Sequence, residues 1–318
     1  MRTIFRFGSN HAYQPVGADA MNHTMNGSDI EMRSQPKEAP PKPRRRLPFR
    51  RIFTFNVLAV LFAHGMLSCH VGTFNNLWFV FLSTPRYSPS PSTNGTDPNA
   101  SLNLPKDYKP HLPFTFTGGL ALPPRSIGTA LAILGVIGIT LQLLIYPRLS
   151  YRLGTARSYR LSLLLFPLTY FLVPFLAIVP TSSLSPLPAS GFLFWASMVL
   201  VLSIQVLART FALPATTILV NNASPHPSVL GTVHGIGQSV SSAMRTLGPV
   251  VGGFVYGKGL SKGIVGLAWW GMGAWAIAGA VAGCWVREGD GHEIWMEGER
   301  EEEEEELERE RERERGKT

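Results

Sequence analysis

The chain has 318 residues, of which 45% are hydrophobic and 16% charged, and its mean hydropathy is +0.10. Its net charge of +8 comes from 29 lysines and arginines against 21 aspartates and glutamates. Between Arg51 and Val286 the only carboxylates are Asp97 and Asp107. Soluble domains carry about 25% charged residues, spread over their surfaces. The composition therefore excludes a soluble enzyme, because the middle of the chain does not face water.

Residues 1–50 are polar, rich in proline and arginine, and predicted to be a disordered cytoplasmic segment. Their basic cluster at 44–51 directly precedes an apolar stretch, which is the usual cytoplasmic flank of a membrane span. We favour this interpretation over nuclear targeting or nucleic-acid binding. No apolar stretch follows Met1 closely enough to predict a signal peptide.

Six stretches of about 20 predominantly apolar residues follow, each long enough to cross a bilayer. They predict an all-α membrane domain of six transmembrane helices over residues 51–286, in contact with the lipid bilayer. In chain order the spans cover about 53–81, 127–146, 161–179, 191–219, 229–256 and 264–286. Pro214 predicts a kink in the fourth span.

The connections between the spans predict an orientation. The connection 147–160 carries four arginines and is assigned to the cytoplasm by the positive-inside rule. The opposite side then receives the connection 180–190 and the turn 258–262, whose two lysines argue mildly against the assignment. With an even number of spans, both termini are expected in the cytoplasm, at the plasma membrane or the vacuole.

A polar insert at 84–125 is also expected on the non-cytoplasmic side. It contains two glycosylation sequons, headed by Asn94 and Asn99. At the other end of the chain, residues 287–318 form a charged low-complexity tail of glutamates and arginines, interpreted as a solvated cytoplasmic extension with some helix.

Polar side chains at membrane depth are costly and often mark function. On the fifth span, His234, Gln238, Ser241 and Arg245 are spaced by four, three and four residues, so they share one helix face. A neighbouring stripe of small residues lets another helix approach closely; it consists of Gly231, Gly235, Ser239 and Ala243.

Other spans carry weaker versions of this pattern. The polar positions are Gln205, Arg209 and Thr216 on the fourth span, His64, Ser68, Asn75 and Asn76 on the first, and Gln142 near the end of the second. Arg209 and Arg245 have no carboxylate in any span to pair with. Either they face a polar cavity, a lipid headgroup or an anionic ligand, or they reach the cytoplasmic surface and cap backbone carbonyls. For His234, a structural hydrogen bond is the alternative to proton transfer.

Motifs of enzyme chemistry are missing from the sequence. It has no phosphate-binding loop, dinucleotide fingerprint, zinc-ligand spacing or nucleophile elbow, and its two cysteines make no disulfide or metal framework. We expect no enzyme activity, no cofactor and no metal site.

The sequence resembles the C-terminal half of a fungal major facilitator superfamily transporter. The branch is the drug:proton antiporter-like one that includes the zinc-induced facilitator-like proteins. The resemblance spans about 51–289 and rests on the segments Phe211–Asn222, Leu230–Gly253, Pro113–Leu120, Tyr151–Thr155 and Phe166–Pro174.

This resemblance implies that the spans are helices 7 to 12 of a twelve-helix protein, arranged as two inverted three-helix repeats. Spans one, two, four and five would face a central cavity, and spans three and six the lipid. The other half of the cavity would come from a missing N-terminal half or a second copy. Asn75 and Asn76 stand where relatives are expected to carry an acidic motif, so proton coupling is not implied.

The favoured hypothesis is transport of a small molecule by alternating access. Its site would comprise Arg245, Gln238 and His234, with Arg209, Gln205, Asn75 and Asn76 as weaker candidates. The alternative is a non-transporting membrane adaptor or fragment whose charged tail binds partners.

Overall fold

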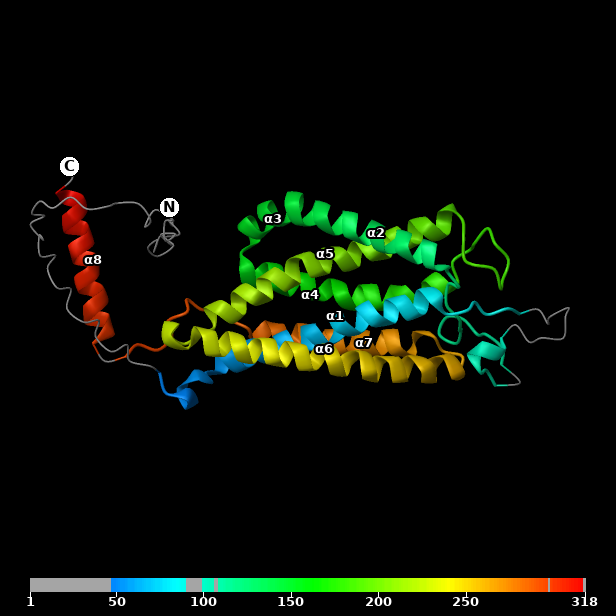
Figure 1. The fold of residues 1–318 in the computed structure, drawn as a ribbon, viewed down its shortest axis with the longest axis horizontal. Coiled ribbons are helices and arrows are strands. Elements are labelled where there is room, and N and C mark those ends of the chain that lie inside the picture. The colour runs from blue at the N-terminus through cyan, green and yellow to red at the C-terminus, as the bar shows by residue number, and fades with distance from the viewer. Residues whose placement is uncertain (1–46, 90–98, 106–107, 297, 317–318) are drawn as a thin grey trace, which may run out of the picture. The chain divides into compact units, whose positions relative to one another are not determined.

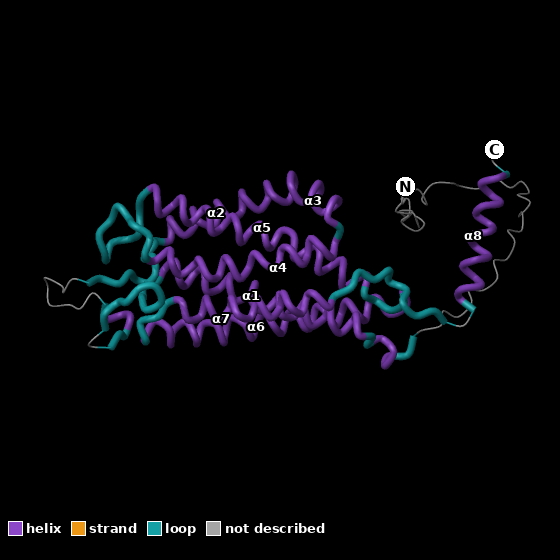
Figure 2. The backbone as a smooth tube through the Cα atoms, turned by 180° about the vertical axis from the view of Figure 1, so that it is seen from behind, coloured by secondary structure: helices purple, strands orange, loops and turns teal. Residues whose placement is uncertain are grey.

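The computed structural model describes residues 47–89, 99–105, 108–296 and 298–316. Within these ranges all the regular elements are helices, joined by loops, and the only β-type pairs are isolated bridges (Figure 2). The long elements are α1 (Phe55–Ser83), α2 (Pro124–Thr140), α3 (Tyr146–Leu153), α4 (Thr155–Leu172), α5 (Phe192–Asn222), α6 (Leu230–Ser261), α7 (Gly266–Trp285) and α8 (Glu299–Arg315). Short 3-10 turns lie at Phe49–Ile52, Ala100–Leu102, Val173–Ala177 and Pro227–Val229, and a π-helical turn at Leu141–Ile145.

Most of the segment predicted to be disordered, residues 1–46, lies outside the described residues, as does Asn94. The last residues of that segment are folded: Leu47 is buried, and a 3-10 turn leads from Phe49 toward α1.

Five of the six predicted spans are helices long and apolar enough to cross a membrane. They are α1, the continuous stretch Pro124–Leu153, α4 with the 3-10 turn that follows it, α5 and α7. The remaining predicted span is α6, which has 32 residues but is not among these five. Its glycines, serines, His234, Gln238 and Arg245 account for its lower hydropathy.

The predicted connection at 147–160 is almost entirely helical, so the expectation of a loop there was wrong. The helix of α2 runs through the π-turn into α3, and Pro147, which has no N–H to donate, follows directly after that irregular turn. The helix is interrupted only at Gly154, whose φ of 77° lies in the left-handed region that favours glycine.

The helices pack side by side in a bundle (Figure 1). α1 lies against α6 and α7, α4 lies against α5 and α7, and α2 packs on α5 at the edge. An aromatic cluster joins α1 to α7: Phe74 stacks on Trp78 at 5.7 Å, and Trp269 meets Phe74 and Phe81 edge-on.

The connections predicted on one side of the membrane do meet at one end of the bundle. Arg86 of the insert donates hydrogen bonds to the Ser183 carbonyl at 3.2 Å and to the Leu187 carbonyl at 3.1 Å, both before α5. The Tyr108 hydroxyl donates to the Gly263 carbonyl in the α6–α7 turn at 3.1 Å. Desolvation and the nearby Tyr87 raise the pKa of Tyr108 to about 12, so the donor stays protonated.

The turn at Gly154, the start of α1 and the end of α7 lie at the other end of the bundle, away from the insert. Arg160, in the first turns of α4, donates to the Val286 carbonyl at 2.8 Å and so caps the C-terminus of α7. The amide of Arg287 donates to Asn56 Oδ1 on α1 at 3.0 Å.

Candidate functional site

Polar side chains from three helices meet inside the bundle. The hydroxyls of Ser68 on α1 and Ser241 on α6 are 2.9 Å apart and buried. His64 Nδ1 on α1 lies 3.3 Å from Thr216 Oγ1 on α5. The polar stripes predicted separately on the first, fourth and fifth spans are therefore brought together.

Arg209 joins this group from α5. Its Nη1 donates to Asn75 Oδ1 on α1 at 3.4 Å. Arg209 also lines a groove of about 320 Å³ between α2 and α5, together with Gln142. Its partner is an amide, which leaves the positive charge of Arg209 uncompensated.

Arg245 lies near the middle of α6 and is exposed on the bundle surface. It meets α1 at Gly72, where an added Cβ would lie 3.1 Å from the Arg245 Cα, about one turn before Asn75, the partner of Arg209. Among the described residues, none accepts a hydrogen bond from Arg245 or forms an ion pair with it. Two like charges therefore lie near one another without a carboxylate, an arrangement that attracts anions.

The other members of the predicted α6 stripe differ in their surroundings. His234 Nε2 lies 3.2 Å from Asn221 Oδ1, at the end of α5. This contact fits the structural alternative for His234. Gln238 is exposed, and no described side chain bonds to its amide. It shares the open face with Arg245.

Two of the weaker candidates are placed differently from the expectation. Gln205 is fully buried, and neither polar atom of its amide has a hydrogen-bond partner among the described residues. It therefore does not line an open cavity in this structure. Asn76 is exposed, but its Nδ2 donates to the Gly72 carbonyl of its own helix at 3.0 Å.

Glycines explain how α6 reaches α1. A Cβ on Gly72 would lie 3.1 Å from the Arg245 Cα, and one on Gly248 would meet Thr73 and lie 2.7 Å from the Cys69 carbonyl. By contrast, nothing lies within 4 Å of a Cβ on Gly231 or Gly235. The predicted stripe of small residues is therefore open, and a different set of glycines makes the close contact.

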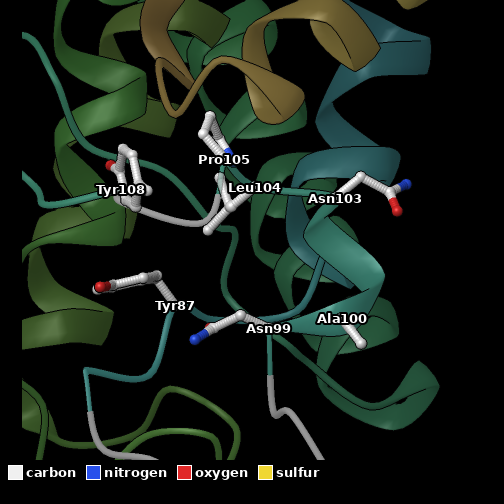
Figure 3. Close-up of a pocket in the computed structure, with 7 residues that line it drawn as sticks. All are labelled: Tyr87, Asn99, Ala100, Asn103, Leu104, Pro105 and Tyr108. Atoms are coloured by element: carbon white, nitrogen blue, oxygen red, sulfur yellow. The ribbon is translucent and has the colours of Figure 1, made fainter.

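Of the two glycosylation candidates, Asn99 lies within the residues that the structure describes. Its Oδ1 accepts from the Ser88 amide at 2.9 Å and its Nδ2 donates to the Ser88 carbonyl at 2.8 Å. It lines a pocket of about 420 Å³ with Tyr87 and Tyr108, whose side chains are drawn in Figure 3. Nδ2, the atom that would carry a glycan, is thus already engaged in holding the insert together.

Sequence reasoning missed one buried polar pair. His70 Nδ1 on α1 lies 2.9 Å from the Tyr170 hydroxyl on α4, and both side chains are buried. His70 lies off the predicted polar face, so helical spacing alone had no way to single it out. The pair joins α1 to α4 inside the aromatic cluster.

The chain matches the model of the Major Facilitator Superfamily over residues 108–315, more than half of its length. The chain belongs to this superfamily. It is 35% identical over 240 residues to the "Major facilitator superfamily multidrug transporter mfsB" of Aspergillus fumigatus, covering 76% of this chain and 35% of that protein. The predicted family and the all-α, multi-pass membrane fold are confirmed.

More distant relatives point the same way. The chain is 28% identical over 159 residues to the "Major facilitator-type transporter psiT2" of Psilocybe cubensis and of Psilocybe cyanescens, covering 48% of this chain and 30% of each relative. This chain spans about a third of the length of the curated relatives it matches. No solved structure matches it.

Proposed function

We propose that the chain forms one half of a membrane carrier that moves a small molecule by alternating access. The observation that carries the proposal is the basic polar face on α1, α5 and α6, where Arg245 packs at Gly72 and Arg209 binds Asn75 on successive turns of α1, with no carboxylate in the described spans. Such charges are tolerated at membrane depth when they face water or a ligand. A small molecule with an anionic group fits this face best.

The exposed residues of the other helices support this allocation. α4 exposes Leu161, Leu164 and Leu168, and α7 exposes Ile277 and Val281, all of them apolar. Faces of this kind suit lipid. The helices with polar open faces are then left to line the substrate path.

A second six-helix unit would complete the cavity. The continuous helical stretch Pro124–Leu153 packs on α5 and buries few of its other residues. On α6, Gly231 and Gly235 are left uncovered. Small residues on an open helix face favour close packing by another helix. Either an N-terminal half or a second copy of this chain would supply it, with both termini cytoplasmic, at the plasma membrane or the vacuole.

The roles of the side chains follow from their positions. Arg245 and Arg209 would attract the anionic group, and Gln238 would bind it by hydrogen bonds. Closing the path brings that group between the two arginines, where lower local polarity strengthens the attraction. The described spans contain no carboxylate that would carry a proton.

The test is transport in yeast lacking its main efflux carriers, with the chain expressed alone and with an N-terminal half. Retention of a panel of small organic anions and neutral drugs is measured. We expect Arg245→Ala and Gln238→Ala to abolish most export at unchanged membrane levels. Arg152→Ala, an exposed arginine on α3, is the matched control and should keep it. Unchanged export in the first two variants would refute the site.

The adaptor hypothesis predicts a different result. The chain would then be a stable membrane protein that exports nothing under either condition and forms no complex with a second six-helix unit. Such an outcome would favour partner binding by the charged tail over transport.

A further inference from the structure

The segment after α7 packs across the end of the bundle. The amide of Gly291 donates to the Asn222 carbonyl at 3.0 Å, and the amide of Ile294 donates to the Pro225 carbonyl at 2.8 Å. Thr54 Oγ1 donates to Glu293 Oε2 at 3.0 Å. The beginning of the charged tail is therefore attached to the start of α1 and to the α5–α6 connection, whereas a solvated extension was expected.

Three metal-binding side chains meet where this segment ends. His226 lies in the α5–α6 connection, His292 in the docked segment, and Glu299 at the first residue of α8. His226 Nε2 is 2.8 Å from Glu299 Oε1, and His292 Nε2 is 3.7 Å from Glu299 Oε2. One ligand atom from each residue lies within 4.8 Å of the others.

His226 is the buried member of this group, whereas the side chains of His292 and Glu299 are partly exposed. His226 is only 5% exposed. The Nε2 atom of His292 is inaccessible to solvent and has no hydrogen-bond partner among the described residues. The ring of His292 is fixed by stacking on Trp295 at 3.9 Å. A buried polar atom without a partner is costly, and a cation placed between the three residues would satisfy it.

We propose that His226, His292 and Glu299 bind a zinc-type divalent cation that ties the C-terminal segment to the α5–α6 connection. Two imidazoles and a carboxylate are a zinc ligand set, with bonds of about 2.0–2.2 Å and a fourth position open to water. Ligand atoms around such an ion lie about 3.3 Å apart, as tetrahedral geometry requires at these bond lengths. Measured from the single atom Glu299 Oε2, the Nε2 atoms of His226 and His292 are 3.0 and 3.7 Å away, on either side of this value.

The protonation states fit with one rearrangement. The amide of Ser228 donates to His226 Nδ1 at 3.1 Å, so in the metal-free state the proton is on Nε2 and points at Glu299. A cation would take the place of that proton. Nδ1 would then become the donor, with Ser228 Oγ at 2.7 Å positioned to accept from it, as partners of metal-bound histidines do. The Ser228 amide would give up its bond to Nδ1 in this rearrangement.

Glu299 needs no rearrangement. The Met296 amide donates to its Oε2 at 2.9 Å, and His226 Nε2 lies 2.8 Å from its Oε1, so the carboxylate is already held toward the other two residues. A carboxylate placed in this way can act as a metal ligand.

The site departs from the expectation of no metal, and the reason is spacing. His226 and His292 are separated by α6 and α7, so no short-range motif links them. The site is also independent of transport, because its ligands lie at the end of the bundle and outside the polar face. Its failure in a binding experiment would leave the proposed function untouched.

The experiment is isothermal titration of the purified full chain, carrying no histidine tag, with Zn²⁺ in detergent. We expect one site, weakened at least about tenfold by His292→Ala and by Glu299→Gln. His111→Ala and Glu308→Gln, both exposed and outside the cluster, are the matched controls and should bind like the wild type. Equal binding in all five proteins would assign the zinc to the acidic helix α8 and overturn the proposal, as would no binding at all.

Two further measurements keep the test independent of folding. X-ray absorption at the zinc edge should count two imidazole ligands in the wild type and one in His292→Ala. Hydrogen exchange of residues 287–299 should slow when Zn²⁺ is added and recover with a chelator. A bound zinc with no imidazole ligand would also overturn the proposal.

Discussion

Helices α6 and α7 follow one another in the chain and both pack against α1, yet they are built in opposite ways. α6 contacts α1 through Gly248, Ser241 and the Cα of Arg245. Its exposed residues include Gln238 and Arg245 as well as the apolar Val250 and Phe254. α7 buries Trp269 and Met272 among glycines and alanines on its inner face, and exposes only apolar and small residues, of which Val281 is an example.

The contrast shows that the two helices meet different surroundings. Large apolar side chains on both faces suit a helix between protein and lipid. Small residues on the inner face and polar residues on the outer face suit a helix between its own bundle and a water-filled path or a second unit. If this is right, stability depends on side-chain volume at Trp269 of α7 and on the absence of a side chain at Gly248 of α6.

The largest expected effect is on the inner face of α7. Trp269→Ala should lower the free energy of unfolding by about 3–5 kcal/mol, because the ring packs against Phe74 and Phe81. Trp285→Ala is the matched control, since 59% of that residue is exposed. Thermal unfolding in detergent measures both. Equal losses would contradict the assignment of inner and outer faces.

On α6, replacing a closely packed glycine by alanine should lower the free energy of unfolding. Gly248→Ala places a Cβ against Thr73 and the Cys69 carbonyl, and overpacking of this kind costs about 1–3 kcal/mol. Gly253→Ala, one turn further along, has nothing within 4 Å of the new Cβ. It should leave stability unchanged or raise it by about 0.5–1 kcal/mol, as alanine does in helices. Thermal unfolding in detergent measures both variants, and equal losses of stability would contradict the assignment of Gly248 to a close contact and of Gly253 to an open face.

Part of this contrast was predictable from the sequence and part was not. Runs of about 20 apolar residues predicted six spans, and five of them are helices long and apolar enough to cross a membrane. Helical spacing put Arg245 and Gln238 on one face, because spacing along a helix fixes direction. It did not reveal which glycines touch α1, since Gly231 and Gly248 look alike until the neighbouring helix is in place. It also assigned Gln205 to an open face, because the burial of a side chain depends on helices far away in sequence.

A smaller effect is expected from the hydrogen bond that joins α6 to α1. Ser241→Ala removes the buried contact between its hydroxyl and Ser68. Such bonds between membrane helices contribute about 0.6 kcal/mol on average. Ser242→Ala, an exposed neighbour on the same helix, should cost less. A Ser241→Ala, Ser68→Ala double-mutant cycle measures the coupling, and a coupling of zero would show that the two hydroxyls act independently.

The smallest effect on stability should come from the residue expected to matter most for transport. Arg245→Ala removes an exposed charge that has no bonded partner among the described residues, and it keeps the Cα and Cβ that lie beside Gly72 of α1. Its free energy of unfolding should therefore change by less than about 0.5 kcal/mol. Arg160→Ala is the informative comparison, because that arginine caps α7 through the Val286 carbonyl and its loss should lower stability. A marked loss in Arg245→Ala would mean that this arginine holds the bundle together, and its place on a substrate path would then lose its main support.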